Sequence, residues 1–198
     1  MKRRNLIIML ALVTIAALLA GCSNNDENEW KRLVCEVSSI NNGTPLLSAY
    51  LYVGADKEAG TEDDIFPIDW VPVSFYARPY SSAIVLPEDG VSSWFHVTGY
   101  DLTWHPGASA PAELTDYNVT NGLCEALVPV NDHGLVNILI ADRVMKEEPW
   151  FQDLILNPGL SYTAACDIKF YGHETGNTEV VTVEGGFMVT FYGAVNPD

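Results

Sequence analysis

The chain has 198 residues, of which 48% are apolar and 18% are charged, a balance typical of globular proteins. Ten Lys and Arg residues stand against 26 Asp and Glu residues, so the formal net charge at pH 7 is −16. Nucleic-acid binding and adsorption to anionic lipid both require clustered basic residues. The composition therefore excludes nucleic acid as a partner and makes adsorption of the folded surface to anionic lipid unfavourable.

The first residues of the chain have the composition of a secretory signal peptide. Lys2, Arg3 and Arg4 precede residues 6–20, which are apolar except for Thr14. As a helix this run would extend about 22 Å, whereas the hydrocarbon core of a bilayer needs roughly 30 Å. A basic start, a short apolar run and small residues at its end indicate export. We therefore assign residues 1–21 to a cleaved leader.

The end of this leader reads Leu19-Ala20-Gly21-Cys22 and resembles the lipobox of bacterial lipoproteins. The resemblance implies that Cys22 is acylated on sulfur and becomes the new N-terminus, which makes the membrane a partner through acyl chains. Two or three chains form a stable anchor where one is marginal. Ser23, in place of the Asp that favours inner-membrane retention, indicates the outer membrane. The alternative is a plain signal peptide whose Cys22 pairs elsewhere.

A polar segment separates Cys22 from the first aromatic residue, Trp30. Residues 23–29 contain no apolar side chain, which indicates a flexible tether. The lipidated cysteine and tether thus occupy residues 22–29. Residues 30–198 are long enough for one domain with its own hydrophobic core.

Within this domain the apolar residues recur with a period of two in short segments that are rich in β-branched and aromatic residues. In the first segment, Cys35 and Val37 share a face. Residues 46–52 are apolar on both faces, which suits a central strand, whereas Pro72 in residues 68–76 indicates an edge or a bulge. Further strands are expected at residues 94–104, 127–130, 135–141, 165–172 and 187–192, the last with a possible earlier start at 180–183.

Two connections complete the expected organisation. Residues 131–134 read Asn-Asp-His-Gly and predict a hairpin turn. Residues 141–156 are the one helical candidate, and Pro149 limits them to a short helix or crossover. Seven or eight strands with so few helices predict an all-β fold, an antiparallel Ig-like β-sandwich.

Residues 97–104, 170–177 and 189–191 carry aromatic and glycine patterns such as Val-Thr-Gly-Tyr-Asp-Leu-Thr-Trp and Phe-Tyr-Gly-His-Glu-Thr-Gly-Asn. These patterns resemble Ig-like β-sandwich lipoproteins of anaerobic, metal-reducing bacteria. The resemblance covers residues 97–195. It implies a sandwich fold and a location in the cell envelope, and it supplies no catalytic residues.

An acidic loop over residues 56–64 is the first candidate site. Its spacing resembles the calcium loops of secreted bacterial proteins, with Lys57 in place of the usual Gly, and Ca²⁺ takes six to eight oxygen ligands from such loops. The chain requires no cofactor for folding, but Ca²⁺ is possible here, with Asp56, Glu58, Asp63 and Asp64 as ligands. The alternative, which we favour, is a solvated acidic hairpin tip.

The cysteines and histidines offer little further metal chemistry. After lipidation Cys35, Cys124 and Cys166 remain, and an oxidising compartment allows one disulfide, for which Cys35 and Cys166 are the preferred pair. Three buried thiols are the alternative. The absence of a Cys-x-x-Cys motif excludes a zinc ribbon and c-type haem attachment. None of the four histidines has a two-His helical spacing, so we expect no transition-metal site.

Aromatic side chains near expected loops are the remaining candidates. Trp104, Trp150 and Tyr80 could stack on sugars, although core packing is the alternative for any aromatic residue in a sandwich. Asp132 and His133 are adjacent, but no Gly-x-Ser-x-Gly elbow accompanies them. We therefore expect a lipid-anchored, non-catalytic binding or structural module of the envelope. The alternatives are a Ca²⁺-stabilised carbohydrate-binding lipoprotein and a carboxylate-based hydrolase.

Overall fold

The computed structural model describes residues 32–84, 86 and 93–195. The leader, Cys22 and the tether lie outside the described residues. In chain order the strands and helical segments are β1 (Leu33–Ile40), η1 (Asn41–Gly43), β2 (Leu46–Tyr52), β3 (Asp69–Pro79), β4 (Trp94–Pro106), η2 (Ala112–Tyr117), β5 (Val119–Pro129), β6 (Asp132–Ala141), α2 (Arg143–Lys146), η3 (Pro149–Gln152), α3 (Asp153–Leu156), β7 (Ser161–Glu174) and β8 (Val181–Val195).

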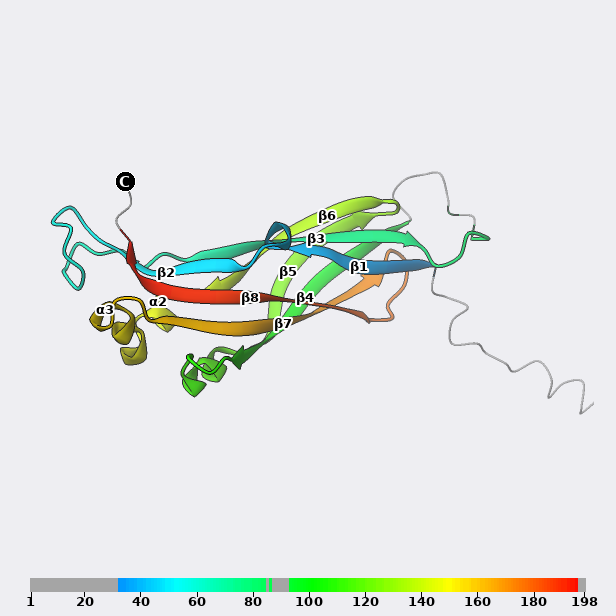
Figure 1. Cartoon of the computed structure of the whole chain (residues 1–198). Helices are drawn as coiled ribbons and strands as arrows, with labels where there is room; N and C mark the ends of the chain where they lie inside the picture. Colours follow the sequence, from blue (N-terminus) through cyan, green and yellow to red (C-terminus); the bar gives the residue numbers. More distant parts are fainter. Residues whose placement is uncertain (1–31, 85, 87–92, 196–198) are drawn as a thin grey trace, which may run out of the picture.

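The strands form two sheets packed face to face (Figure 1). One sheet has the order β1-β3-β6, and the other has the order β2-β8-β7-β4-β5. All pairs are antiparallel except β2 with β8, which run parallel. The prediction of an all-β sandwich is therefore confirmed, and its strand pairs are antiparallel, as predicted, except for this one. No helix among the described residues is long and apolar enough to cross a membrane.

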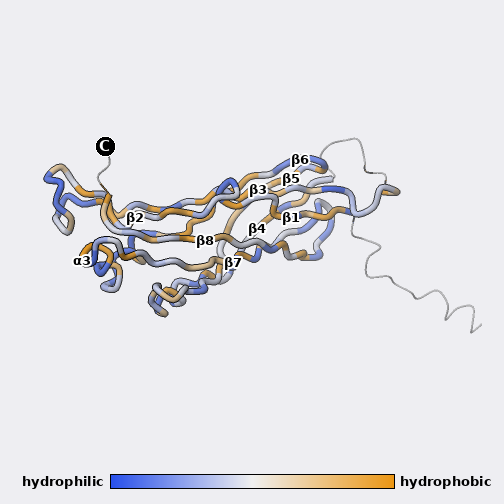
Figure 2. The backbone as a smooth tube through the Cα atoms, in the orientation of Figure 1, coloured by the Kyte–Doolittle hydropathy of each residue, from blue (hydrophilic) through white to orange (hydrophobic). Residues whose placement is uncertain are grey.

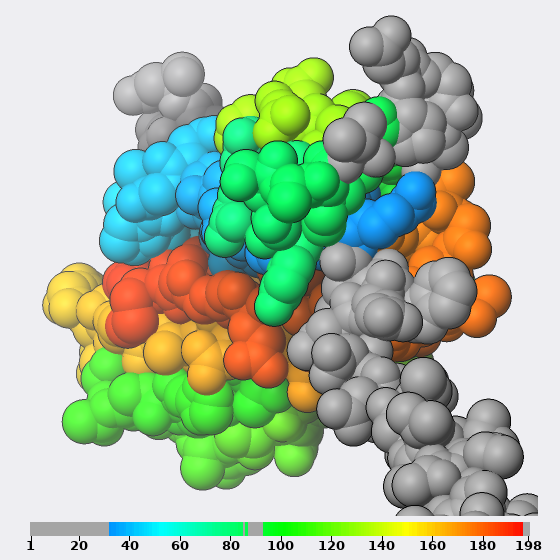
Figure 3. Space-filling model, turned by 90° about the vertical axis from the view of Figure 1, so that its right-hand side faces the viewer, coloured from blue at the N-terminus to red at the C-terminus, as the bar shows by residue number. Residues whose placement is uncertain are grey.

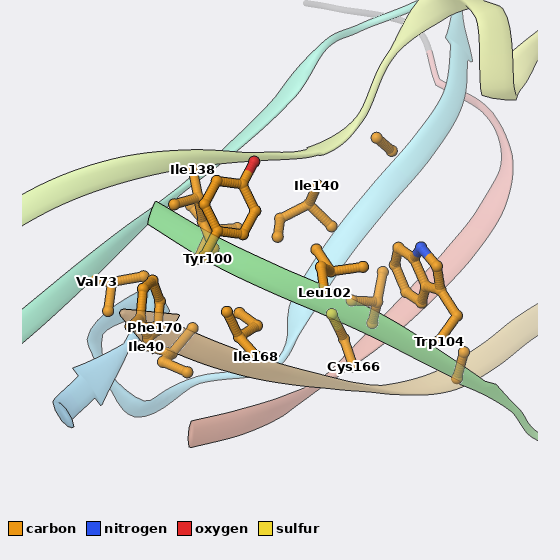
Figure 4. Packing of buried hydrophobic residues seen from close by; sticks show 14 of the residues in the cluster. Ile40, Val73, Tyr100, Leu102, Trp104, Ile138, Ile140, Cys166, Ile168 and Phe170 are labelled. Carbon is orange, nitrogen blue, oxygen red and sulfur yellow. The ribbon is translucent and has the colours of Figure 1, made fainter. Parts of the chain in front are cut away.

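The inner faces of the two sheets form the core, as the period-two patterns predicted. Tyr100, Leu102 and Trp104 of β4 are buried (Figure 4), and so are the alternate residues of β7, where Phe170 meets Phe75 of the opposite sheet with ring centroids 4.9 Å apart. Figure 2 shows hydrophobic residues recurring along the strands. Each fully buried ring or aliphatic side chain contributes about 1.5–3 kcal/mol to stability.

Strand β2 has the predicted bounds but not the predicted place, because it lies at an edge of the five-stranded sheet. Pro72 belongs to β3, the middle strand of the other sheet. The last pair between β1 and β3 is Ile40 with Val73, so at Pro72 the strand has β6 as its only neighbour. Pro72 therefore sits at a local edge of the sheet, the kind of position where a proline is tolerated.

The connections differ in part from the predictions. The turn after β5 leads into β6, which belongs to the other sheet, so it crosses between layers and does not close a hairpin. Asn131 makes this turn with φ of 57°, and its backbone N–H donates to the carbonyl of Ala77 at 2.7 Å. The segment from α2 to α3 is a series of single helical turns, as Pro149 predicted.

The sandwich is elongated, and the chain enters it at one end. Figure 3 faces this end and shows the blue to lime residues of β1, β3 and β6 above the red residues of β8. The buried carboxylate of Glu174 accepts the backbone N–H groups of Arg32 at 2.8 Å and Leu33 at 2.6 Å. The loop between β2 and β3, residues 53–68, lies at the opposite end (Figure 1). Glu174 thus fixes the start of β1 far from that loop.

Candidate ligand-binding pocket

A hollow of about 540 Å³ lies at the end of the sandwich opposite to the start of β1. We call it the tip pocket. It opens between the 53–68 loop and the segment from α2 to α3, and its volume falls within the range of small-molecule sites. Its apolar lining consists of Tyr50, Leu51, Phe66, Ile155 and Leu156, and its polar lining includes Thr61, Glu62, Asp64, Arg143 and Gln152.

One wall of the pocket is the acidic loop, which Asp64 holds in shape. Its carboxylate accepts three backbone N–H groups, from Gly60 at 2.6 Å, Gly54 at 3.0 Å and Thr61 at 3.1 Å. Hydrogen bonds to an ionised acceptor are stronger than neutral ones. The loop is therefore closed by a carboxylate that caps its own backbone.

The neighbouring acidic residues are used in the same way. Asp63 accepts the Thr61 hydroxyl at 2.8 Å and the Ala55 N–H at 2.7 Å, and these hydrogen bonds, the Thr61 one first, hold the pKa of Asp63 below its usual value. Asp56 accepts the N–H of Glu58 at 2.9 Å. Within the described residues, no three His, Cys, Asp or Glu side chains are placed to hold a metal ion. The four predicted calcium ligands are therefore not gathered around a common point.

The floor of the pocket is a cluster of aromatic rings. Tyr50 of β2 stacks on Phe151 with centroids 5.6 Å apart and meets Phe66 edge-on at 5.4 Å. Burial raises the pKa of Tyr50, and the nearby charges of Asp64 and Glu147 raise it further. The floor is therefore aromatic, and the Tyr50 hydroxyl stays uncharged at neutral pH.

Lys146 of α2 lies beneath this floor and is fully buried. Its Nζ donates to the carbonyls of Ala49 at 2.7 Å and Pro67 at 2.8 Å and forms an ion pair with Asp69 at 2.7 Å. Asp69 also accepts the hydroxyl of Ser48 at 2.6 Å. Burial lowers the pKa of Lys146, and Asp69 opposes that shift. One side chain thus joins α2 to β2, to the 53–68 loop and to β3.

Sequence reasoning missed Lys146, because a lysine in a short helical segment is normally solvated. The available signal was the capping pattern before it, since Asp142 accepts the N–H of Met145 at 2.8 Å and starts the helix there. That pattern places a helix but not its buried face.

The rim of the pocket combines charge with exposed apolar surface. The guanidinium of Arg143 pairs with Glu147 at 2.6 Å and lies 6.0 Å from the centroid of the Phe66 ring. Leu156 of the lining is exposed, and so are Ile65 and Val144, which are adjacent in sequence to the lining residues Asp64 and Arg143. The pocket can therefore hold an apolar group on its floor and a charged or polar group at its rim.

The predicted sugar-stacking residues divide into three cases. Trp104 is 1% exposed and packs against Phe191 at 5.9 Å, so the expectation of an exposed ring there is wrong (Figure 4). Trp150 is half-buried, and one face of its ring is covered by Phe151 at 4.1 Å. Tyr80 is exposed, as expected. Trp104 lies on the same face of β4 as Leu102, and the alternation of the strand turns both side chains into the core.

The exposed tryptophan that sequence reasoning missed is Trp70. It is 58% exposed on the outer face of the three-stranded sheet and lies opposite Leu139 of β6. Val71, Val73 and Phe75 of the same strand are fully buried. Their alternation was the signal that places Trp70 outside.

The three cysteines of the described chain are free thiols. Cys35 lies in β1 of one sheet and Cys166 in β7 of the other, and both are buried, so the expected Cys35–Cys166 disulfide is absent from this structure. Burial raises the pKa of Cys35 to about 12 and that of the half-buried Cys124 to about 11. The alternative of three buried thiols therefore holds for Cys35 and Cys166, whereas Cys124 is only half-buried.

A second hollow, of about 480 Å³, lies on the outer face of the five-stranded sheet and is lined by several carboxylates. Among them, Asp101 accepts the hydroxyl of Tyr171 and the N–H of Asn121, and these hydrogen bonds lower the pKa of Asp101. A general acid in glycoside hydrolysis needs a raised pKa. Asp101 is therefore unsuited to the acid role in a carboxylate-based hydrolase.

Comparison with known proteins finds no matching family model and no matching curated protein. Two solved structures of Escherichia coli are similar. AggA, the major subunit of aggregative adherence fimbriae type I, has 9% identity and a TM-score of 0.24 and covers 81% of this chain and 95% of its own. A mutant of the enterotoxigenic adhesin CfaE has 15% identity and a TM-score of 0.28 and covers 84% of this chain and 49% of its own. Similarity at this level carries no argument, and the fold assignment follows from the two packed sheets themselves.

Proposed function

We propose that the chain is a lipid-anchored protein of the cell envelope, in the outer membrane, whose sandwich is a non-catalytic binding module. The observation that carries this proposal is the position of the tip pocket. The chain enters the sandwich at one end, and the pocket opens at the other (Figure 1). An anchor at Cys22 would therefore hold the pocket away from the bilayer.

The dimensions support such a role. Strand β3 runs from the 53–68 loop back to the level of Leu33, and its 11 residues cover about 35 Å at roughly 3.3 Å per residue. The polar composition of residues 23–29 supports a tether between Cys22 and the domain. The net charge of −16 keeps the body from adsorbing to anionic lipid, so acyl chains are the means of attachment that the sequence supports.

The lining of the tip pocket supports binding. Apolar side chains form its floor, and a few charged side chains stand at its rim, which is the usual composition of ligand sites. The pKa values of Asp63 and Asp101 are lowered, whereas carboxyl groups poised as general acids have raised values. These observations favour recognition over catalysis.

The anchor is tested by replacing Cys22 with Ala in the native cell. The proposal expects the wild-type protein in the membrane fraction with incorporated palmitate analogue, and Cys22→Ala in the soluble fraction without label. Cys124→Ala is the matched control and should behave as wild type. Membrane fractionation and labelling that are unchanged in Cys22→Ala would exclude the anchor.

The pocket is tested separately by crosslinking in the native envelope. Leu156→Arg places a charge at the rim of the tip pocket, and Leu135→Arg changes an equally exposed leucine on the three-stranded sheet. We expect Leu156→Arg to lose the crosslinked partner and Leu135→Arg to keep it. Loss of the crosslinked partner in Leu135→Arg alone would show that the binding surface is the three-stranded sheet and not the tip pocket.

The exposed Trp70 favours a second candidate, a carbohydrate-binding lipoprotein. A sheet face with a solvent-exposed indole beside Pro72 and Leu139 is a platform on which a sugar ring can stack. Binding on a glycan array that is lost in Trp70→Ala and kept in Tyr80→Ala would support this candidate over the tip pocket.

A further inference from the structure

We propose that His96 and His173 form a binding site for a late first-row divalent metal ion, such as Zn²⁺, Ni²⁺ or Cu²⁺. The two residues are directly opposite each other on β4 and β7, and both point to the outer face of the five-stranded sheet. Their ring centroids are 5.4 Å apart and the ring planes are inclined by 69°. The site is separate from the tip pocket, and it does not rest on the proposed function.

Within the described chain, Nε2 of each ring makes no hydrogen bond, and Nε2 of His96 is paired only with the carboxylate of Glu125, at 3.4 Å. Nδ1 of His173 lies 3.1 Å from the carbonyl oxygen of Glu174. A carbonyl only accepts, so this nitrogen carries the proton and Nε2 keeps its lone pair, the arrangement that metal-binding histidines use. Nε2 of His96 is buried and has no hydrogen-bond partner. A bound ion would give it one.

The surroundings provide room and charge for an ion. His96 lines a surface hollow of about 470 Å³ together with Thr98, Leu123, Cys124 and Glu125. The carboxylate of Glu125 lies 3.4 Å from Nε2 of His96 and supplies a negative charge beside the site. Cys124 lines the same hollow, but it does not form with the two histidines a group of three side chains placed to hold an ion.

The number of ligands decides which ion is expected. No three His, Cys, Asp or Glu side chains are already gathered around one point in the described chain, so two imidazoles bind and water completes the coordination. The β-carbons of directly opposite residues lie about 4.5–5.5 Å apart, which allows two imidazole nitrogens to reach one ion at about 2.0–2.1 Å. Imidazole favours late first-row metals over Ca²⁺ and Mg²⁺, which take oxygen ligands.

The test is a titration of tag-free mature protein with Ni²⁺, followed by calorimetry. We expect one ion per chain, an affinity at least tenfold weaker in His96→Gln and in His173→Gln, and a smaller loss in Glu125→Gln. His105→Gln is the matched control, because His105 lies on the same face and pairs with Asp167 at 3.0 Å. Unchanged affinity in both His96→Gln and His173→Gln, or no binding by the wild type, would overturn the proposal.

A second measurement keeps the proposal testable if a variant fails to fold. Cu²⁺ added to the wild-type protein at one equivalent should give an electron paramagnetic resonance spectrum with hyperfine structure from two imidazole nitrogens. A spectrum with one nitrogen donor, or one that disappears in His105→Gln, would place the ion elsewhere and contradict the site.

Discussion

Lys146 is the residue whose replacement tests the structure most severely. Lys146→Met keeps the length of the side chain and removes its charge and its three donors. Asp69, which is 13% exposed, would keep only the Ser48 hydroxyl, and the carbonyls of Ala49 and Pro67 would lose their partner. Removing one member of a buried ion pair costs about 3–5 kcal/mol, because the remaining charge stays buried. We expect a loss of that size in the free energy of unfolding.

The assay is equilibrium unfolding in urea at pH 7, monitored by tryptophan fluorescence. Lys169→Met is the matched control, since Lys169 lies 3.9 Å from Glu184 on the exposed face of β7, where an ion pair is worth about 1 kcal/mol or less. Lys146→Met combined with Asp69→Asn should recover part of the loss, because no carboxylate remains unpaired. A loss in Lys146→Met no larger than that in Lys169→Met would refute the buried ion pair.

The pH dependence of this contribution has a definite sign. Burial lowers the pKa of Lys146 in the folded protein below 10.5, its value without the fold. Between the lowered pKa and 10.5 the unfolded chain therefore binds the proton more strongly, and the contribution of Lys146 to stability rises with pH across that window. This rise should be missing from Lys146→Met.

Three further predictions concern the acidic loop, the thiols and the start of β1. Asp64→Ala removes the acceptor of three N–H groups and should lower the free energy of unfolding in urea by about 1–3 kcal/mol. The loss should be equal in EDTA and in millimolar Ca²⁺. A rise in the melting temperature of the wild type on addition of Ca²⁺ would instead support the calcium hypothesis. A thiol assay of the Cys22→Ala protein, unfolded without reductant, should find three free thiols, Cys35, Cys124 and Cys166, whereas a single free thiol would support the predicted disulfide. Folding raises the pKa values of Cys35 and Cys124 from 9.0, so the free energy of unfolding should also fall as the pH rises from about 9 to 12. Glu174→Gln should cost about 1.5–3 kcal/mol and speed hydrogen exchange at Leu33, whereas unchanged exchange there would show that the carboxylate does not hold the start of β1.

The strands and their inner faces could be predicted because a sheet repeats every two residues. Tyr100, Leu102 and Trp104 share a face in any strand that contains them, whatever its partners are. Pro149 limited the helical segment in the same local way, through its missing N–H. Such features depend only on residues that are close together in the chain, so they can be predicted from a single sequence.

The place of a strand in its sheet could not be predicted, and β2 shows the physical reason. Residues 46–52 are apolar on both faces, which predicted a central strand, and in the structure Ser48 to Leu51 are indeed all buried. An apolar run indicates that both faces of the strand are covered by other side chains, whereas the position of the strand in its sheet depends on which of its two edges bind a neighbouring strand. Here Phe151 covers Tyr50, and Lys146 binds the carbonyl of Ala49. A central strand and a covered edge strand therefore share one sequence pattern.

The buried ion pair of Lys146 and the histidine pair of the proposed metal site were missed for a related reason. Lys146 and Asp69 are 77 positions apart, and His96 and His173 are also 77 positions apart, so no motif of fixed spacing contains either pair. Each becomes visible only when the register of the strands is known, as with the pairing of β4 and β7. The acidic loop, by contrast, was visible in sequence because its residues are contiguous, and its carboxylates bind backbone N–H groups of the same loop.

Trp70 of β3 and Trp104 of β4 show which local rule should decide exposure. Trp104 was selected because it stands near the end of a strand, and Trp70 was passed over although it also stands near one. Position relative to a loop says little about the direction of a side chain, whereas alternation with Val71 and Phe75 on β3, or with Tyr100 on β4, determines it. Alternation puts Trp70 outside and Trp104 inside, as observed. If Trp70→Ala leaves both stability and glycan binding unchanged, exposure alone has no functional weight at this position, and the tip pocket remains the binding surface to pursue.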